Sequence, residues 1–244
     1  MSDIIKTEAV VLSKINYGDS SSIVSLYSES EGKISAIIKG GRNPKSKIGK
    51  VVDPLNHIQV IFYKKNTREI QILTSADLIS YFSRIKQNLD SLKYSLAILE
   101  SVKNLTLEDE PNKKLFKGLV KILNHIENEK ENPAILFGRF FLFFITELGY
   151  DLAIEKCSVC GNQNKPNGAL GFDLELGFVC KDCYQSHSGL EYISAELFNY
   201  LFCLKSNKAF VALNDELLIK FNQLIEKYLK HHIPDFKGIK SLKI

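Results

Sequence analysis

Four cysteines in two pairs have a spacing that suits metal binding. Cys157 and Cys160 form one Cys-x-x-Cys pair, Cys180 and Cys183 form a second, and 19 residues separate the two pairs. Two thiolates three positions apart can hold one side of a tetrahedral ion, and a second pair completes a shell of four sulfurs. Because a closed shell of this kind is typical of structural zinc, the spacing predicts one structural Zn²⁺ per chain, held by these four residues.

Other interpretations of the cysteines remain open. A redox dithiol usually needs only one pair, and a catalytic zinc usually has three protein ligands and an open position. The pairs can also be unmetallated or hold another soft metal. His187, four residues beyond Cys183, is an alternative ligand, although a surface histidine is the simpler interpretation. Cys203 lies in an apolar helical pattern, which predicts a buried small side chain rather than a ligand.

The basic segment, residues 39–50, reads KGGRNPKSKIGK and contains no acidic residue. A phosphate-binding P-loop requires Gly-x-x-x-x-Gly-Lys-Ser/Thr, but no glycine stands five positions after Gly40 or Gly41. Pro44 also removes one backbone amide donor. The spacing therefore excludes a nucleotide cradle and leaves two interpretations, a solvated turn or a loop that contacts the nucleic-acid backbone. On the second interpretation, the contacting residues are Lys39, Arg42, Lys45, Lys47 and Lys50.

The distribution of charge points to the same part of the chain. The 244 residues are 45% apolar and 25% charged, which is ordinary for a globular protein, and the formal net charge is +4. Residues 1–84 hold 12 Lys and Arg against 8 Asp and Glu, whereas residues 85–244 hold 20 of each. The whole excess of positive charge therefore lies in the N-terminal third, and local clustering of this kind is the usual electrostatic footprint of phosphate binding.

No segment reads as a leader or a membrane span. The first residues lack a basic start followed by an apolar run. The most apolar segment, residues 133–145, is interrupted by Gly138 and Arg139 and is shorter than the roughly 20 residues that a membrane helix needs. We therefore expect a cytoplasmic protein, in whose reducing surroundings the cysteines are thiols or metal ligands rather than disulfides.

Short alternating runs fill the first 80 residues. Five strands are predicted, separated by turn signals and without a helical period between them, at residues 7–15, 22–27, 33–38, 57–63 and 69–73. Five short strands favour a small antiparallel barrel or sandwich, of which the OB-fold is the five-stranded case. The basic segment then lies between the third and fourth strands. Four aromatic residues of this region either stack on bases or belong to the core: Tyr17, Tyr27, Phe62 and Tyr63.

The apolar period changes to that of helices after residue 81. Amphipathic helices are predicted over residues 85–102 and 115–126, and a helix that is apolar nearly all round follows at 134–145. Two more helical patterns follow the cysteines, at residues 194–205 and 215–230. The predicted fold is α+β and multidomain, with an OB-fold barrel (1–80), a helical bundle domain in two parts (81–152 and 189–244), and a zinc module inserted between them (153–188).

The order of these features resembles the RecO family of DNA-repair proteins along essentially the whole chain. The likeness rests on residues 7–12 (TEAVVL) with Tyr17-Gly18-Asp19, on residues 37–42 leading into 44–47, and on residues 147–150 (ELGY) leading to Cys157-x-x-Cys160-Gly161. Members commonly have a proline where this chain has Leu152. Some members lack the cysteines, which favours a folding role for the metal.

The resemblance implies an N-terminal OB-fold and a helical domain with an inserted zinc module. It further implies binding of single- and double-stranded DNA, annealing of complementary strands and cooperation with RecR. RecO proteins help to load RecA onto DNA coated by the single-stranded DNA-binding protein, whose acidic C-terminal tail docks on the helical domain in some members. Arg42, Lys45 and Lys47 match the family's basic loop, and the four paired cysteines match its metal site.

Three functional hypotheses follow from the sequence. The first is a DNA-binding mediator that is not an enzyme. The second is a zinc-containing protein-interaction scaffold with no direct role on DNA. The third, a zinc-assisted nuclease or deaminase, lacks a His-x-Glu partner for the thiolates and a carboxylate pair suited to two-metal chemistry.

Overall fold

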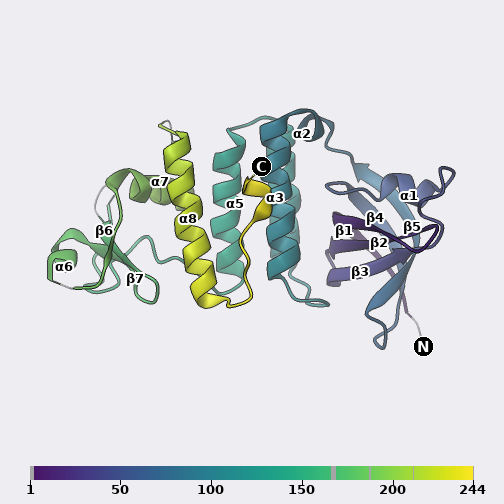
Figure 1. Cartoon of the computed structure of the whole chain (residues 1–244), viewed down its shortest axis with the longest axis horizontal. Coiled ribbons are helices and arrows are strands. Elements are labelled where there is room, and N and C mark those ends of the chain that lie inside the picture. Colours follow the sequence, from purple (N-terminus) through teal and green to yellow (C-terminus); the bar gives the residue numbers. More distant parts are fainter. Residues whose placement is uncertain (1–2, 166–168, 187, 211, 244) are drawn as a thin grey trace. The chain divides into compact units, whose positions relative to one another are not determined.

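The computed structural model describes residues 3–165, 169–186, 188–210 and 212–243, and it divides into two compact units. The first unit comprises Met1–Phe137 with Ile239–Ile244, and the second comprises Gly138–Gly238. Figure 1 follows the chain through both units in sequence colours. Among the residues described, no helix combines the length and the apolar character needed to cross a membrane.

The first unit begins with a closed five-stranded barrel. Its strands follow the order β1-β2-β3-β5-β4, in which β3 and β5 are parallel and the other neighbouring pairs are antiparallel. The bounds are β1 (Asp3–Tyr17), β2 (Ser21–Ser28), β3 (Gly32–Ile38), β4 (His57–Lys64) and β5 (Ile70–Ser80). The five predicted strands are confirmed, and the closed Greek-key-like order is that of an OB-like barrel.

The alternation that predicted the strands also fills the barrel. Alternate residues of β3 point inward, so Ile34, Ala36 and Ile38 are almost fully buried, while Ser35 and Ile37 between them are only partly buried. Ile34 and Ile38 join the inward residues of the other strands, such as Phe62 of β4, in one apolar core cluster. Burying one such side chain contributes about 1.5–3 kcal/mol, so the barrel has its own hydrophobic core.

A short helix, α1 (Lys47–Val51), lies within the basic segment between β3 and β4. The hydroxyl of Ser46 caps this helix by accepting a hydrogen bond of 3.0 Å from the amide of Gly49. Ile48 and Val51 pack against the barrel core. The sequence did not predict α1, because a helix of five residues is too short to show a helical period.

Helices follow the barrel in the same unit. They are α2 (Ser83–Gln87), α3 (Leu89–Leu105) and α4 (Lys113–Glu127), and the C-terminal η1 (Lys240–Lys243) also belongs to this unit. The single helix predicted over residues 85–102 is two helices, because Asn88 takes an extended conformation (φ −112°, ψ 123°) and its side chain caps α3 through the amide of Ser91. The helix predicted over residues 115–126 is confirmed as α4.

The second unit contains the rest of the helices and a small sheet. Its elements are most of α5 (Pro133–Glu147), then β6 (Ala169–Asp173), β7 (Gly177–Cys180), α6 (Lys181–Ser186), β8 (Glu191–Tyr192), α7 (Ala195–Lys205) and α8 (Asp215–His232). The three strands form a sheet in the order β7-β6-β8. The all-round apolar pattern of α5 is confirmed, since the consecutive residues Phe140, Phe141 and Leu142, which point to different sides of the helix, are all buried.

Candidate nucleic-acid interface and metal centre

The first part of the basic segment is a series of hydrogen-bonded turns. The amide of Gly41 donates to the carbonyl of Ile38 (3.2 Å), that of Asn43 to Gly40 (3.0 Å), and that of Ser46 to Asn43 (2.8 Å). Gly40 has a φ of 64°, a value that glycine adopts without the steric cost of a side chain. The glycines that suggested a phosphate cradle therefore serve to turn the chain from β3 into α1.

The segment lies at the end of the barrel that contains the turn between β1 and β2. The backbone amide of Arg42 donates to the carbonyl of Ser20 (2.9 Å), and its Nη1 donates to the carbonyls of Gly18 (3.1 Å) and Asp19 (3.2 Å). Lys14 of β1 donates to the carbonyl of Gly49 in α1 (2.7 Å). The predicted residues thus belong to one ordered end of the barrel rather than to a detached loop.

The cations of the basic segment are exposed and uncompensated. All five side chains are exposed, and among the residues that the structure describes, none of them takes part in an ion pair: Lys39, Arg42, Lys45, Lys47 and Lys50. By contrast, Lys14 is paired with Asp53 nearby. An uncompensated group of cations at one end of a barrel creates a positive potential that attracts polyanions.

The four aromatic residues that we considered for base stacking divide into two groups. Phe62 is fully buried in the barrel core, and Tyr27 is 1% exposed. Burial raises the pKa of Tyr27 to about 12, although a hydrogen bond with the backbone of Asn112 opposes the shift. Tyr17 and Tyr63 are 54% and 41% exposed. Only these last two remain accessible for stacking.

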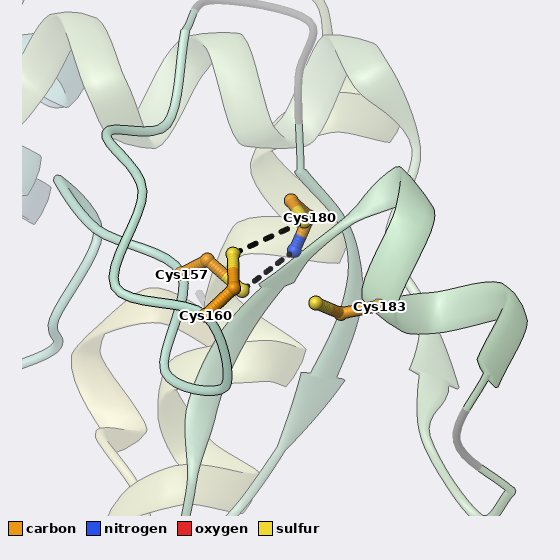
Figure 2. Close-up of side chains that lie close together, drawn as sticks. All are labelled: Cys157, Cys160, Cys180 and Cys183. Atoms are coloured by element: carbon orange, nitrogen blue, oxygen red, sulfur yellow. Dashed lines mark hydrogen bonds between the residues drawn. The ribbon is translucent and has the colours of Figure 1, made fainter.

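The four paired cysteines are brought together as the spacing predicted. Their sulfur atoms all lie within 4.8 Å of one another, and Figure 2 shows them converging from two parts of the chain. Cys157 and Cys160 precede β6, whereas Cys180 ends β7 and Cys183 lies in α6. The amide of Gly161, at φ 73°, donates to the carbonyl of Cys157 and closes the turn of the first pair.

The geometry and electrostatics of this cluster fit a tetrahedral cation. Sγ of Cys160 lies 3.8 Å from Sγ of Cys180, and a tetrahedral ion with bonds of about 2.3 Å to sulfur separates its ligands by about 3.8 Å. Although burial opposes the shift, backbone amides, among them those of Cys160 and Cys180, lower the pKa of Cys157 to about 6. Partial burial and the neighbouring sulfurs raise the pKa of Cys183 to about 12. Four thiolates therefore need a cation to stabilise them together.

His187, the alternative ligand, and Cys203, predicted not to be a ligand, remain to be placed. His187 lies outside the residues that the structure describes. Cys203, expected to be buried in a helix, is a half-buried residue of α7, and its thiol donates to Oδ1 of Asn199 at 3.7 Å. It is not part of the group of four.

An OB-like barrel with an uncompensated basic end, followed by helices and a four-sulfur site, has the features of proteins that contact nucleic acid. Comparison with known proteins identifies the family. Residues 1–82 match the family model described as Recombination protein O N terminal, and residues 86–243 match Recombination protein O C terminal. The chain belongs to the RecO family of DNA repair proteins, as its sequence resemblance indicated.

Individual RecO proteins are similar in sequence to this chain along most of its length. The DNA repair protein RecO of Chloroherpeton thalassium is 30% identical over 98% of this chain and 96% of its own length. That of Acetivibrio thermocellus is 25% identical over 94% of this chain and 92% of its own length. That of Chlorobium limicola is 33% identical over 72% and 67% of the two chains.

Proposed function

We propose that this chain is a recombination mediator that binds single- and double-stranded DNA through the basic end of its barrel and anneals complementary strands. On this proposal it acts with RecR to load RecA onto DNA coated by the single-stranded DNA-binding protein. The observation that carries the proposal is the group of five exposed cations without ion-pair partners among the described residues, held on ordered turns at one end of an OB-like barrel. Membership of a DNA-repair family supports the choice of DNA as the polyanion.

The proposed mechanism needs no catalytic acid or base. Cations that neutralise phosphates release condensed counterions, and this release drives binding with little dependence on base sequence. Two strands held at one positive surface repel each other less, so their bases can pair. The protein is on this view not an enzyme, and its contribution to annealing is electrostatic.

We further propose that the four cysteines hold one structural Zn²⁺. When bound, the ion supplies a closed tetrahedral centre of four thiolates with no position left for substrate. The ion would link Cys157 and Cys160 to Cys180 of β7 and Cys183 of α6. This link would stabilise a part of the chain that has only short strands and one short helix. The role is in folding, and the DNA contacts remain with the barrel.

The partners proposed from the family are RecR and the acidic C-terminal tail of the single-stranded DNA-binding protein, the latter on the helical domain. The setting would be the bacterial cytoplasm.

The alternative function is a protein-interaction scaffold in which the helices and the cysteine cluster bind protein and the basic segment only aids solubility. A scaffold of this kind has no affinity for an oligonucleotide, so direct titration separates the two functions.

The deciding experiment is a titration of a fluorescent single-stranded oligonucleotide at several salt concentrations. Replacing Arg42, Lys45 and Lys47 together with alanine should weaken binding and flatten the log–log salt slope by about 2, since each phosphate neutralised on a single strand contributes about 0.7. The matched control replaces three exposed lysines of α4 and the turn that follows it, Lys117, Lys121 and Lys130, with alanine.

Equal slopes for the wild type, the basic-segment variant and the control would remove the segment from the DNA site. Absence of binding by the wild type at low salt would favour the scaffold. An annealing assay on complementary strands coated by the single-stranded DNA-binding protein, with and without RecR, then tests the mediator role itself.

A further inference from the structure

The connection between α3 and α4 crosses the outside of the barrel. This segment, residues 106–112, reads TLEDEPN and is called the strap below. The amide of Asp109 donates to the carbonyl of Lys33 in β3 (2.9 Å), and Glu108 forms an isolated parallel bridge with Lys33. At Gly32 the approach is so close that an added Cβ would lie 2.2 Å from the carbonyl oxygen of Glu110. The strap therefore lies directly on the start of β3.

The strap covers part of a surface that OB-folds use for ligands. OB-fold proteins bind oligonucleotides on the face of strands 2 and 3 and on the loops between strands 1 and 2 and between strands 4 and 5. In this barrel the half of that face next to the basic segment stays partly exposed at Ile23 and Ile37. In the other half, Tyr27 is 1% exposed and its hydroxyl meets the backbone of Asn112 at the end of the strap.

The strap places carboxylates against lysines of the barrel. Glu108, Asp109 and Glu110 are consecutive acids and all are exposed. Oε1 of Glu108 lies 3.6 Å from Nζ of Lys33, and Oδ1 of Asp109 lies 3.1 Å from Nζ of Lys64. These acids therefore occupy positions beside cations of the OB face, where the phosphates of a bound strand would lie.

The two lysines differ in how firmly they are held. Nζ of Lys33 also donates to the carbonyls of Lys103 (2.9 Å) and Thr106 (2.5 Å), so it remains at the C-terminal end of α3 without Glu108. Among the described residues, Lys64 has only carboxylate partners, Asp109 and Glu31, and these raise its pKa. Loss of the strap contact would leave Lys64 with Glu31 (2.6 Å) as its one carboxylate partner among the described residues, so the ammonium could also meet a phosphate.

We propose that the strap is an internal competitor of the nucleic-acid backbone, which limits the binding surface to the half of the OB face beside the basic segment. This inference rests on the proposed DNA-binding function. The strap is displaceable because its side-chain ion pairs involve carboxylates that are about half exposed, 52% for Glu108 and 54% for Asp109. A polyanion that displaces it gains Lys64 and continues toward the β4–β5 loop, whose Lys65 and Arg68 are exposed.

The test compares two double variants with the same change in net charge. Glu108→Gln/Asp109→Asn neutralises the strap, and Asp90→Asn/Glu129→Gln neutralises two other exposed acids of the same unit. Asp90 lies in the first turn of α3, about 25 Å along that 17-residue helix from the strap. Each pair includes one residue with positive φ, Asp109 at 57° and Glu129 at 49°, so backbone effects are matched.

Affinity for a fluorescent single-stranded oligonucleotide at several salt concentrations is the measurement. The strap variant should bind about three- to tenfold more tightly at low salt, and its salt slope should steepen by about 0.7 as Lys64 gains one phosphate. The control variant should bind within about twofold of the wild type, because Asp90 lies at the end of α3 opposite the strap and Glu129 follows the end of α4 opposite the strap. Equal affinities and slopes for the two double variants would overturn the proposal.

A failure of this inference is distinguishable from a failure of the proposed function. If the wild type binds and the Arg42, Lys45 and Lys47 variant does not, the function holds whatever the strap variant does. Should the strap variant fail to fold, hydrogen exchange at the amide of Asp109 in the wild type decides. Faster exchange on saturation with the oligonucleotide supports displacement of the strap, and unchanged or slower exchange overturns it.

Discussion

Nη1 of Arg42 lies 3.1 Å from the carbonyl oxygen of Gly18 and donates a hydrogen bond to it. The same nitrogen reaches the carbonyl of Asp19, and the backbone amide of Arg42 bonds to Ser20. One residue therefore carries positive charge and also fixes the basic segment to the turn between β1 and β2. Lys45 and Lys47, which match the same family loop, have exposed side chains without such an anchor among the described residues.

The two contributions of Arg42 can be separated by Arg42→Lys. Lysine keeps the charge but lacks the planar fork that reaches two carbonyls, so we expect about two- to tenfold weaker oligonucleotide binding, the equivalent of one lost hydrogen bond. The log–log salt slope should stay unchanged, because the number of cations is the same. Lys45→Arg is the control and should leave both quantities unaltered. A wild-type affinity for Arg42→Lys would show that the anchor does not contribute to binding.

Gly49 is predicted to be intolerant of any side chain. An added Cβ would lie 1.9 Å from the carbonyl oxygen of Gly41, so Gly49→Ala must push α1 away from the turns before it. We expect a loss of about 2–4 kcal/mol in the free energy of unfolding, as for other severe steric conflicts. At Gly40, by contrast, nothing lies within 4 Å of an added Cβ, and only its φ of 64° opposes alanine.

Gly40→Ala is therefore the matched comparison, with an expected cost of about 1–2 kcal/mol from the left-handed backbone alone. Urea denaturation followed by circular dichroism measures both variants. A smaller loss for Gly49→Ala than for Gly40→Ala would contradict the packing of α1 on Gly41.

Much of the barrel was predictable from the sequence because each strand alternates apolar and polar residues. In β3 the burial of Ile34, Ala36 and Ile38 follows that alternation directly. The order of the strands was not predictable, since the parallel pairing of Ser35–Ile37 with Ile70–Ile72 joins parts of the chain that local patterns do not relate. The division of the helix before Leu89 was missed for a different reason: Asn88 is compatible with a helix interior and with a cap.

The same limit applies to the candidate site: local spacing was predictable, whereas contacts between residues far apart in the sequence were not. Spacing alone predicted the cluster of Cys157, Cys160, Cys180 and Cys183, because two chelating pairs constrain each other strongly. No local pattern indicated a role for Lys33 or Lys64, whose neighbours in space, Glu108 and Asp109, lie far away along the chain. The only available signal was the run of three acids beginning at Glu108, which taken alone is typical of a solvated turn.

Glu100 of α3 is predicted to hold the C-terminal segment in a pH-dependent way. Its carboxylate accepts hydrogen bonds from the amides of Lys240 (2.9 Å) and Ser241 (2.8 Å) and from the Ser241 hydroxyl (2.7 Å). Burial opposes the shift, but these hydrogen bonds lower the pKa of Glu100 below its ordinary value of 4.5. Its contribution is therefore complete above pH 4.5 and is lost as the pH falls through the lower, folded-state pKa.

Glu100→Gln removes the charge and one of the two acceptor oxygens, so it should weaken this contact at every pH, with a loss of about 2 kcal/mol, the value of hydrogen bonds to a charged group. Urea denaturation at about pH 7 and about pH 3 measures it, and the difference between wild type and variant should shrink at the lower pH. The exposed Glu110→Gln serves as a control for the general effect of removing an acid. A difference that grows on acidification would contradict a lowered pKa for Glu100 in the folded protein.

The cysteine cluster leads to a prediction about metal content and stability. Purified protein should contain about one zinc per chain, and Cys157→Ser should lose it, since three thiolates leave the shell open. Removal of the metal by a chelator should lower the melting temperature, because binding to the folded cluster contributes directly to folding free energy. Cys203→Ser, at a cysteine outside the cluster, should keep the metal. Folded protein with no metal, and with a melting temperature unaffected by chelator, would exclude a structural ion.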